Sequence, residues 1–151
     1  VFKPTLSNFR ETFGLADKKI VLGVASTWDE RKGLSDFIRL SEMLSDCYVI
    51  VLVGVKKAQA KSLPQRIITV PRTNNTRELA EIYTAADVFV NLTYEDNYPT
   101  VNLESQACGT PCLTYRTGGS VESVTSDCVV AQGDLQAMLK KIEEITAKEE
   151  A

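Results

Sequence analysis

Histidine is absent from the 151-residue sequence. Without an imidazole, this chain alone cannot form a Ser-His-Asp triad, a Cys-His dyad or a histidine metal site. Cysteine is scarce, and Cys47, Cys108, Cys112 and Cys128 form no Cys-x-x-Cys pair and no four-ligand zinc spacing. We therefore expect no metal centre and predict buried, reduced thiols of a cytosolic domain; a Cys108–Cys112 redox pair is the alternative.

Long apolar runs and a basic charge balance are also missing. The longest apolar run, over residues 48–53, is far shorter than the ~18–20 residues needed to span a bilayer. The chain opens without an initiator methionine or a signal-peptide core, as expected of a cytoplasmic protein and of a piece of a longer one. The formal net charge of −3 argues against nucleic acid as a partner, because phosphate neutralisation requires an excess of Lys and Arg.

What the sequence does have is the length and composition of one globular domain. Its 151 residues fall within the ~100–200 typical of a single domain. The hydrophobic share of 44% and the charged share of 25% are ordinary for a folded protein and argue against disorder. We interpret residues 1–14 as an interdomain linker with a short helix, and residues 15–151 as one Rossmann-like domain.

Apolar runs alternate with amphipathic segments along this domain. The runs predict strands over residues 19–25, 48–53, 67–70, 87–92, 112–115 and 128–130. The amphipathic segments predict helices over residues 33–45, from an Asn75 cap to Ala86, after Pro99, and from Leu135 onward. Continuous β-branched runs suit a parallel sheet that is covered on both faces. The predicted fold class is therefore α/β, a doubly wound, mostly parallel, Rossmann-like sheet.

In such a sheet, ligands bind beyond the carboxyl ends of the strands, and the first strand-to-helix loop is chemically rich there. It carries the hydroxyls of Ser26 and Thr27 and the adjacent cations Arg31 and Lys32. These residues come just before a predicted helix N-terminus, whose free amides and positive partial charge attract phosphate. The alternative is that both cations are merely solvated.

Two further loops lie at the same predicted edge. Arg72 and Thr73 belong to a turn-rich loop before the Asn75-capped helix. Glu95 and Asp96 follow the fourth strand, and Glu104 lies about one turn into the next helix. Loop geometry would allow Asp96 and Glu104 to reach one cleft.

Several motifs that follow one another in the chain resemble the donor-binding, C-terminal domain of family 4 retaining glycosyltransferases. The main ones are Asp96-x7-Glu104, Ala107-Cys108-Gly109-Thr110-Pro111 and Gly118-Gly119-x-x-Glu122. Three shorter matches are Arg31-Lys32-Gly33, Ala86-Asp87-Val88-Phe89-Val90 and Phe2-Lys3-Pro4. The resemblance covers nearly the whole chain and implies one half of a GT-B fold, in which two Rossmann-like domains face each other across a cleft.

The resemblance implies roles for individual residues. Glu104 would hold the ribose hydroxyls of the donor nucleotide, and Asp96 would be the catalytic carboxylate that faces the transferred sugar. Lys32 would neutralise the diphosphate as the second catalytic residue. The implied nucleotide-sugar site as a whole comprises Ser26, Thr27, Arg31, Lys32, Arg72, Thr73, Glu95, Tyr98, Thr100, Val101 and Glu104.

The sequence departs from the family pattern at two places. Aspartate stands at position 96 where the family has glutamate, and Glu95 is its neighbour, so either carboxylate is a candidate to face the sugar. Thr27 stands where the family often has an arginine. Either Arg31 replaces that arginine or Lys32 acts alone.

The resemblance also implies a function. It is sugar transfer from a UDP-, GDP- or ADP-linked donor to a saccharide or lipid-linked acceptor in bacterial polysaccharide assembly, without metal or other cofactor. The acceptor would bind mostly to a missing N-terminal domain, so this chain should be inactive alone, and the full-length enzyme could associate peripherally with a membrane. Two alternatives are a stand-alone nucleotide-binding protein and a receiver-like signalling module.

Overall fold

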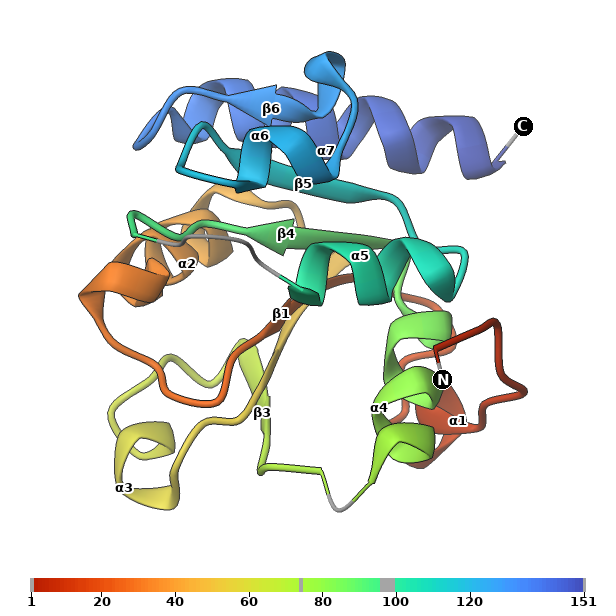
Figure 1. Ribbon diagram of the computed structural model, residues 1–151. Coiled ribbons are helices and arrows are strands. Elements are labelled where there is room, and N and C mark those ends of the chain that lie inside the picture. The colour runs from red at the N-terminus through yellow and green to blue at the C-terminus, as the bar shows by residue number, and fades with distance from the viewer. Residues whose placement is uncertain (1, 74, 96–99, 151) are drawn as a thin grey trace.

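The computed structural model describes residues 2–73, 75–95 and 100–150, and these form a six-stranded parallel sheet with helices on both faces (Figure 1). The strands are β1 (Lys19–Val24), β2 (Tyr48–Val53), β3 (Ile67–Val70), β4 (Val88–Asn91), β5 (Cys112–Tyr115) and β6 (Val129–Val130). All six were predicted, with ends that differ by at most one residue, and the predicted α/β fold class is confirmed. Their order, β3-β2-β1-β4-β5-β6, is that of Rossmann sheets, whereas receiver-like modules have the order 2-1-3-4-5. The sheet order therefore argues against the receiver-like alternative.

Two hydrophobic cores lie on the two faces of the sheet. Successive side chains of a strand point to opposite faces, so Val21 belongs to one core and its neighbour Leu22 to the other. Both residues are fully buried, because β1 is a central strand, paired with β2 and β4, and helices cover both faces of the sheet. The continuous apolar runs in the sequence follow from this two-sided burial.

In the described part of the chain, the four longer helices and the short α1 divide between these two faces. Residues of α2 (Leu34–Met43) and α7 (Leu135–Glu150) pack into the first core. Residues of α1 (Phe9–Thr12), α4 (Thr76–Ala85) and α5 (Thr100–Ala107) pack into the second. The α4 cap is as predicted, since the Asn75 side chain accepts a hydrogen bond of 2.9 Å from the Glu78 amide. Among the described residues, none of the helices combines the length and apolar character that crossing a bilayer requires.

Short helical turns and one cysteine differ from the sequence expectation. A 3₁₀ turn (Glu30–Lys32) and the helices α3 (Lys57–Ala60) and α6 (Ser120–Ser123) were not predicted. One turn of helix is too short to display a 3.6-residue apolar period, so the pattern carries no signal for it. All four cysteines are free; Cys108 and Cys112 are buried as predicted, but Cys47 is exposed, which corrects the expectation that all are buried.

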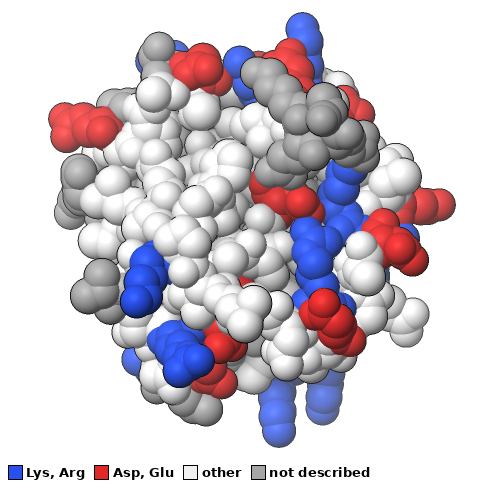
Figure 2. All heavy atoms as spheres, turned by 90° about the vertical axis from the view of Figure 1, so that its right-hand side faces the viewer, with Lys and Arg blue, Asp and Glu red and all other residues white. Residues whose placement is uncertain are grey.

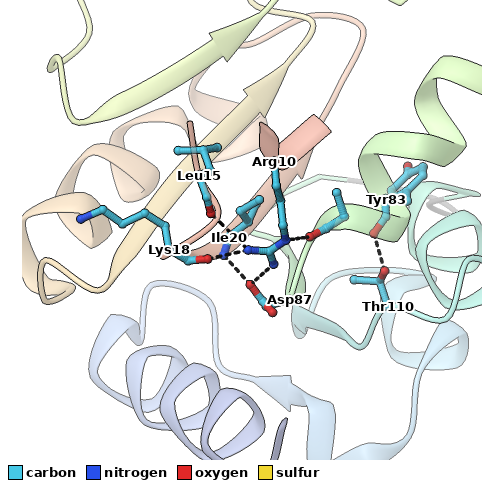
Figure 3. Close-up of polar contacts among 8 residues, drawn as sticks. Arg10, Leu15, Lys18, Ile20, Tyr83, Asp87 and Thr110 are labelled. Atoms are coloured by element: carbon cyan, nitrogen blue, oxygen red, sulfur yellow. Dashed lines mark hydrogen bonds and ion pairs between the residues drawn. The ribbon is translucent and has the colours of Figure 1, made fainter. Parts of the chain in front are cut away.

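An ion pair anchors α1 at the amino edge of the sheet, between the starts of β1 and β4 (Figure 3). The Asp87 carboxylate accepts hydrogen bonds from the Arg10 guanidinium at 2.6 Å and from the Ile20 amide at 2.7 Å. Arg10 also donates to the carbonyls of Ala85 and Lys18. The segment before β1 is therefore fastened to the domain by partly buried hydrogen bonds as well as by packing.

Figure 2 shows the side of the molecule that lies at the right of Figure 1, where α1 and α4 are found. Positive and negative side chains lie next to one another around a broad uncharged area. Surfaces that bind nucleic acid carry instead an extended patch of one, positive, sign. This face therefore has the mixed charge expected of a weakly acidic domain.

Candidate functional site

A pocket of about 380 Å³ opens at the carboxyl edge of the sheet, where β1 and β2 end. This volume falls within the ~300–1,000 Å³ of typical small-molecule sites. Five of the predicted site residues line it: Ser26, Arg72, Thr73, Val101 and Glu104. They come from three loops or helices that follow β1, β3 and β4. From β1, the chain adds β2 and β3 on one side of the sheet and then β4, β5 and β6 on the other. Sheets of this kind bind their ligands at the point between β1 and β4 where the strand order reverses.

Glu104 supplies the carboxylate of this pocket. It lies on α5 and is half-buried, and its Oε1 accepts a hydrogen bond of 2.9 Å from the Tyr83 hydroxyl on α4. Burial raises the pKa of Glu104, and the hydrogen bond from Tyr83 acts in the opposite direction. Burial, reinforced by the Glu104 charge, raises the pKa of Tyr83, so the tyrosine is the proton donor of the pair. The pocket therefore holds an oriented hydrogen-bond acceptor.

Another part of the pocket lining comes from the loop between β3 and α4. Arg72 and Thr73 line the pocket there, together with Asn75 and Thr76 at the start of α4. Arg72 is exposed, and it brings a positive charge to the same pocket as the Glu104 carboxylate. The pocket thus presents both acceptor and donor groups, as recognition of a polar ligand requires.

The first loop only partly meets the sequence expectation. Ser26 lines the pocket, whereas Thr27 is exposed and is not among its lining residues. The loop does precede a helix, but the Lys32 amide already donates to Asp29, at 3.1 Å to its carbonyl and 3.2 Å to its carboxylate. That amide is therefore already bonded within the loop, whereas the phosphate-binding role expected of the loop as a whole stays a prediction.

Arg31 and Gly33 tie this loop to the end of β4. The Arg31 carbonyl accepts hydrogen bonds from the Tyr94 amide at 2.7 Å and from the Thr93 hydroxyl at 3.2 Å. Gly33 has φ +80°, and a Cβ there would come within 2.2 Å of the Leu92 carbonyl oxygen. Only glycine combines this backbone conformation with so close an approach. The Lys-Gly pair of the sequence is thus held against the loop that follows β4.

The loop after β4 brings a second carboxylate close to the Arg31 guanidinium. The Glu95 side chain is exposed and lies 4.0 Å from the Arg31 guanidinium. The Tyr94 hydroxyl donates to the Asp36 carboxylate on α2, and the Thr117 hydroxyl donates to the Thr93 carbonyl at 2.7 Å. The stem of this loop is therefore fixed from two sides.

The remaining predicted residues lie at or beyond the end of this loop. Asp96 and Tyr98 lie outside the described residues, so the choice between Glu95 and Asp96 stays open. Thr100 is the exposed first residue of α5, and Val101 next to it lines the pocket. Among the described residues, no group of three or more Cys, Asp or Glu side chains could hold a metal ion.

Tyr83 and Phe2 are site residues that the sequence analysis did not assign. Tyr83 lies within the amphipathic helix predicted from the Asn75 cap to Ala86, and a buried tyrosine usually gives its hydroxyl a partner. Phe2 lies in the predicted linker, yet it lines the same pocket as Glu104. Gly54 lines it too, with φ +99°, and a Cβ there would come within 1.8 Å of the Ala25 carbonyl oxygen. These contacts join segments that are far apart in the sequence, so a local sequence pattern does not predict them.

Comparison with known proteins gives consistent matches. A family model described as glycosyl transferases group 1 matches residues 7–151. The alpha-galactosylglucosyldiacylglycerol synthase of Streptococcus pneumoniae is 28% identical over 115 residues, which are 69% of this chain and 30% of that protein. The chain also spans 30% of the D-inositol 3-phosphate glycosyltransferase of Stackebrandtia nassauensis, so it covers about a third of these relatives.

Solved structures match over nearly the whole chain. The sucrose-phosphate synthase of Thermosynechococcus elongatus superposes with a TM-score of 0.82 and 27% identity, over 97% of this chain and 40% of that one. Anabaena HepE in complex with UDP-glucose has a TM-score of 0.81 at 17% identity, over 94% of this chain and 43% of that one. The HepE likeness is one of fold.

Proposed function

The chain belongs to the glycosyl transferases group 1 family, and on this premise we propose that it binds the nucleotide-sugar donor of a glycosyltransferase. The observation that carries the proposal is the pocket at the carboxyl edge of the sheet, which gathers Ser26, Arg72 and Glu104. HepE, which shares the fold, was crystallised with UDP-glucose. The proposed reaction is transfer of a sugar from a UDP-, GDP- or ADP-linked donor to a saccharide or lipid-linked acceptor in bacterial polysaccharide assembly.

In this proposal the pocket holds the nucleotide. The Glu104 carboxylate accepts hydrogen bonds from the ribose hydroxyls, because it is an oriented anion on a pocket wall. Arg72 and Thr73, which line the same pocket, contact the base. Ser26 and the start of α5, with Thr100 and Val101, face the diphosphate.

The loops beside the pocket would act on the leaving diphosphate and on the sugar. Lys32 and Arg31 neutralise the negative charge that develops as the sugar leaves, and fixed cations do so without reorganising. With such cations the reaction needs no metal ion. Glu95 or Asp96 faces the transferred sugar, and the reaction retains its anomeric configuration by same-face attack.

The acceptor would bind to another part of the full-length enzyme. Catalysis by positioning requires that both reactants are held in one cleft, and the described pocket provides a wall only for the donor. The full-length enzyme would thus contribute an N-terminal acceptor domain and would work in the cytoplasm, in peripheral contact with the membrane where its acceptor is lipid-linked.

A calorimetric titration of the 151-residue chain with UDP, GDP and ADP tests the proposal. One of them should bind, and Glu104→Ala should weaken its binding by about 1.5–3 kcal/mol, as for hydrogen bonds to charged groups. Glu143→Ala, which removes an exposed carboxylate from α7, is the matched control and should leave the affinity unchanged. Absence of binding, or equal affinities for both variants, would refute the assignment of this pocket.

A further inference from the structure

Tyr83 holds the Glu104 carboxylate from inside the protein. The tyrosine is fully buried, and its hydroxyl reaches Glu104 Oε1 at 2.9 Å. Among the described residues no other hydrogen bond to this carboxylate occurs, so Tyr83 alone orients it. Oε2 is then the oxygen that remains for a ligand hydroxyl. A buried aromatic ring is a rigid support, because packing removes the freedom of its two side-chain torsions.

Two phenylalanines hold the Tyr83 ring in turn. Phe89 on β4 and Phe2 in the N-terminal segment both meet it edge to face, with ring centroids 5.7 and 5.8 Å away. Phe2 also lines the pocket beside Glu104. A hydrogen bond of 3.0 Å from the Thr5 amide to the Thr84 hydroxyl fastens this segment to α4. The segment before β1 therefore reaches the pocket that the carboxyl edge forms.

We propose that Tyr83 is the positioning residue of Glu104 and that Phe2 completes the wall of the nucleotide pocket. The proposal rests on the proposed function, because it assigns Oε2 of Glu104 to a ribose hydroxyl. Phe2 then belongs to the binding site, although it lies in the segment that is predicted to be a linker. Since Phe2 touches both the pocket and the ring that supports Glu104, displacement of this segment weakens binding of the nucleotide.

The test separates positioning from packing by the ligand that is used. The 151-residue chain is titrated with the nucleoside diphosphate that binds tightest among UDP, GDP and ADP, and with its 2′,3′-dideoxy analogue. Tyr83→Phe should weaken binding of the normal ligand about fivefold to tenfold, which is less than the roughly 10- to 100-fold effect of a lost hydrogen bond to a charged group, because the ligand keeps its own bond to Glu104 and only the orientation of the carboxylate is lost. The same variant should leave binding of the dideoxy analogue unchanged, because that ligand has no hydroxyl for Glu104 to accept.

Tyr48→Phe is the matched control. Tyr48 also has a hydrogen-bonded hydroxyl, 2.6 Å from the Thr146 hydroxyl, but it does not line the pocket. This variant should bind both ligands as the unmodified chain does. If Tyr83→Phe weakens both ligands equally, its role is structural and the proposal is wrong.

A second pair of variants tests the N-terminal segment. Phe2→Ala should weaken binding of the normal ligand at least threefold, whereas Phe13→Ala should not, since Phe13 is an aromatic of the same segment outside this pocket. Equal affinities for these two variants would overturn the role of Phe2.

The outcomes also separate the two proposals. Binding that is lost in Glu104→Ala but unaffected by Tyr83→Phe would overturn the positioning role alone. If none of the three nucleoside diphosphates binds the unmodified chain, the proposed function fails and this inference fails with it.

Discussion

Replacing Asp87 by alanine should destabilise the domain strongly, although the residue lies at the opposite edge of the sheet from the pocket. Its Oδ2 accepts hydrogen bonds from the Arg10 guanidinium at 2.6 Å and from the Ile20 amide at 2.7 Å. Alanine leaves the Ile20 amide, in the centre of the sheet, without this acceptor. Arg10 keeps its bonds to carbonyl oxygens, including that of Lys18 at 2.6 Å, but loses its counter-charge.

The expected loss in the free energy of unfolding is about 3 kcal/mol. Hydrogen bonds to charged groups are worth roughly 1.5–3 kcal/mol each, and two are lost here. The side chains of Arg10 and Asp87 are 27% and 20% exposed, so solvent screening lowers the sum toward the smaller values. At roughly 2–4 °C per kcal/mol for a domain of this size, the melting temperature should fall by about 6–12 °C.

Thermal and urea denaturation followed by circular dichroism measure this effect. Asp46→Ala is the control, because its contact with Arg66 is 3.9 Å long and its carboxylate is fully exposed; its melting temperature should hardly change. A double-mutant cycle of Asp87→Ala with Arg10→Ala isolates the energy of the pair. Equal melting temperatures for Asp87→Ala and Asp46→Ala would show that the Asp87 contacts drawn in Figure 3 do not stabilise the fold.

Three further predictions concern the pocket and its loops. Affinity for the nucleoside diphosphate should fall as the pH falls through the pKa of Glu104, because protonation removes the charge that strengthens the hydrogen bond from the ribose. Burial raises that pKa, so titration should show the fall above the pH range of an exposed glutamate, and Glu104→Gln should abolish it. Gly33→Ala should lower the melting temperature more than Gly14→Ala. Both glycines have positive φ, but a Cβ at Gly33 would clash with the Leu92 carbonyl oxygen, whereas a Cβ at Gly14 meets no atom within 4 Å. Equal losses in melting temperature would contradict the close approach at Gly33. An assay with a radiolabelled donor should show no sugar transfer by the 151-residue chain alone. In the full-length enzyme, Asp96→Asn should lower turnover more than donor affinity. Normal turnover of that variant would assign the catalytic role to Glu95.

The amino-acid sequence alone was enough to predict the fold class and the edge of the sheet where the chemistry lies. Strand runs, helix periodicity and the Asn75 cap are local patterns, and each reports on neighbouring residues of one element. Because parallel strands share one carboxyl edge, the order of strands and loops along the chain already predicts that Ser26, Arg72 and Glu104 lie at one place. In the structure these three residues line one pocket.

Which groups of those loops meet depends on tertiary packing. Tyr83 and Glu104 are 21 residues apart, and their hydrogen bond depends on how α4 packs beside α5. The contact of Phe2 with Tyr83 joins the chain's first residues to its middle. The Lys32 amide is taken by Asp29, a detail of loop conformation that residue types do not reveal. Such contacts arise when separate elements pack together. The residue pattern of a single helix or strand does not indicate which other elements will lie beside it in the folded protein.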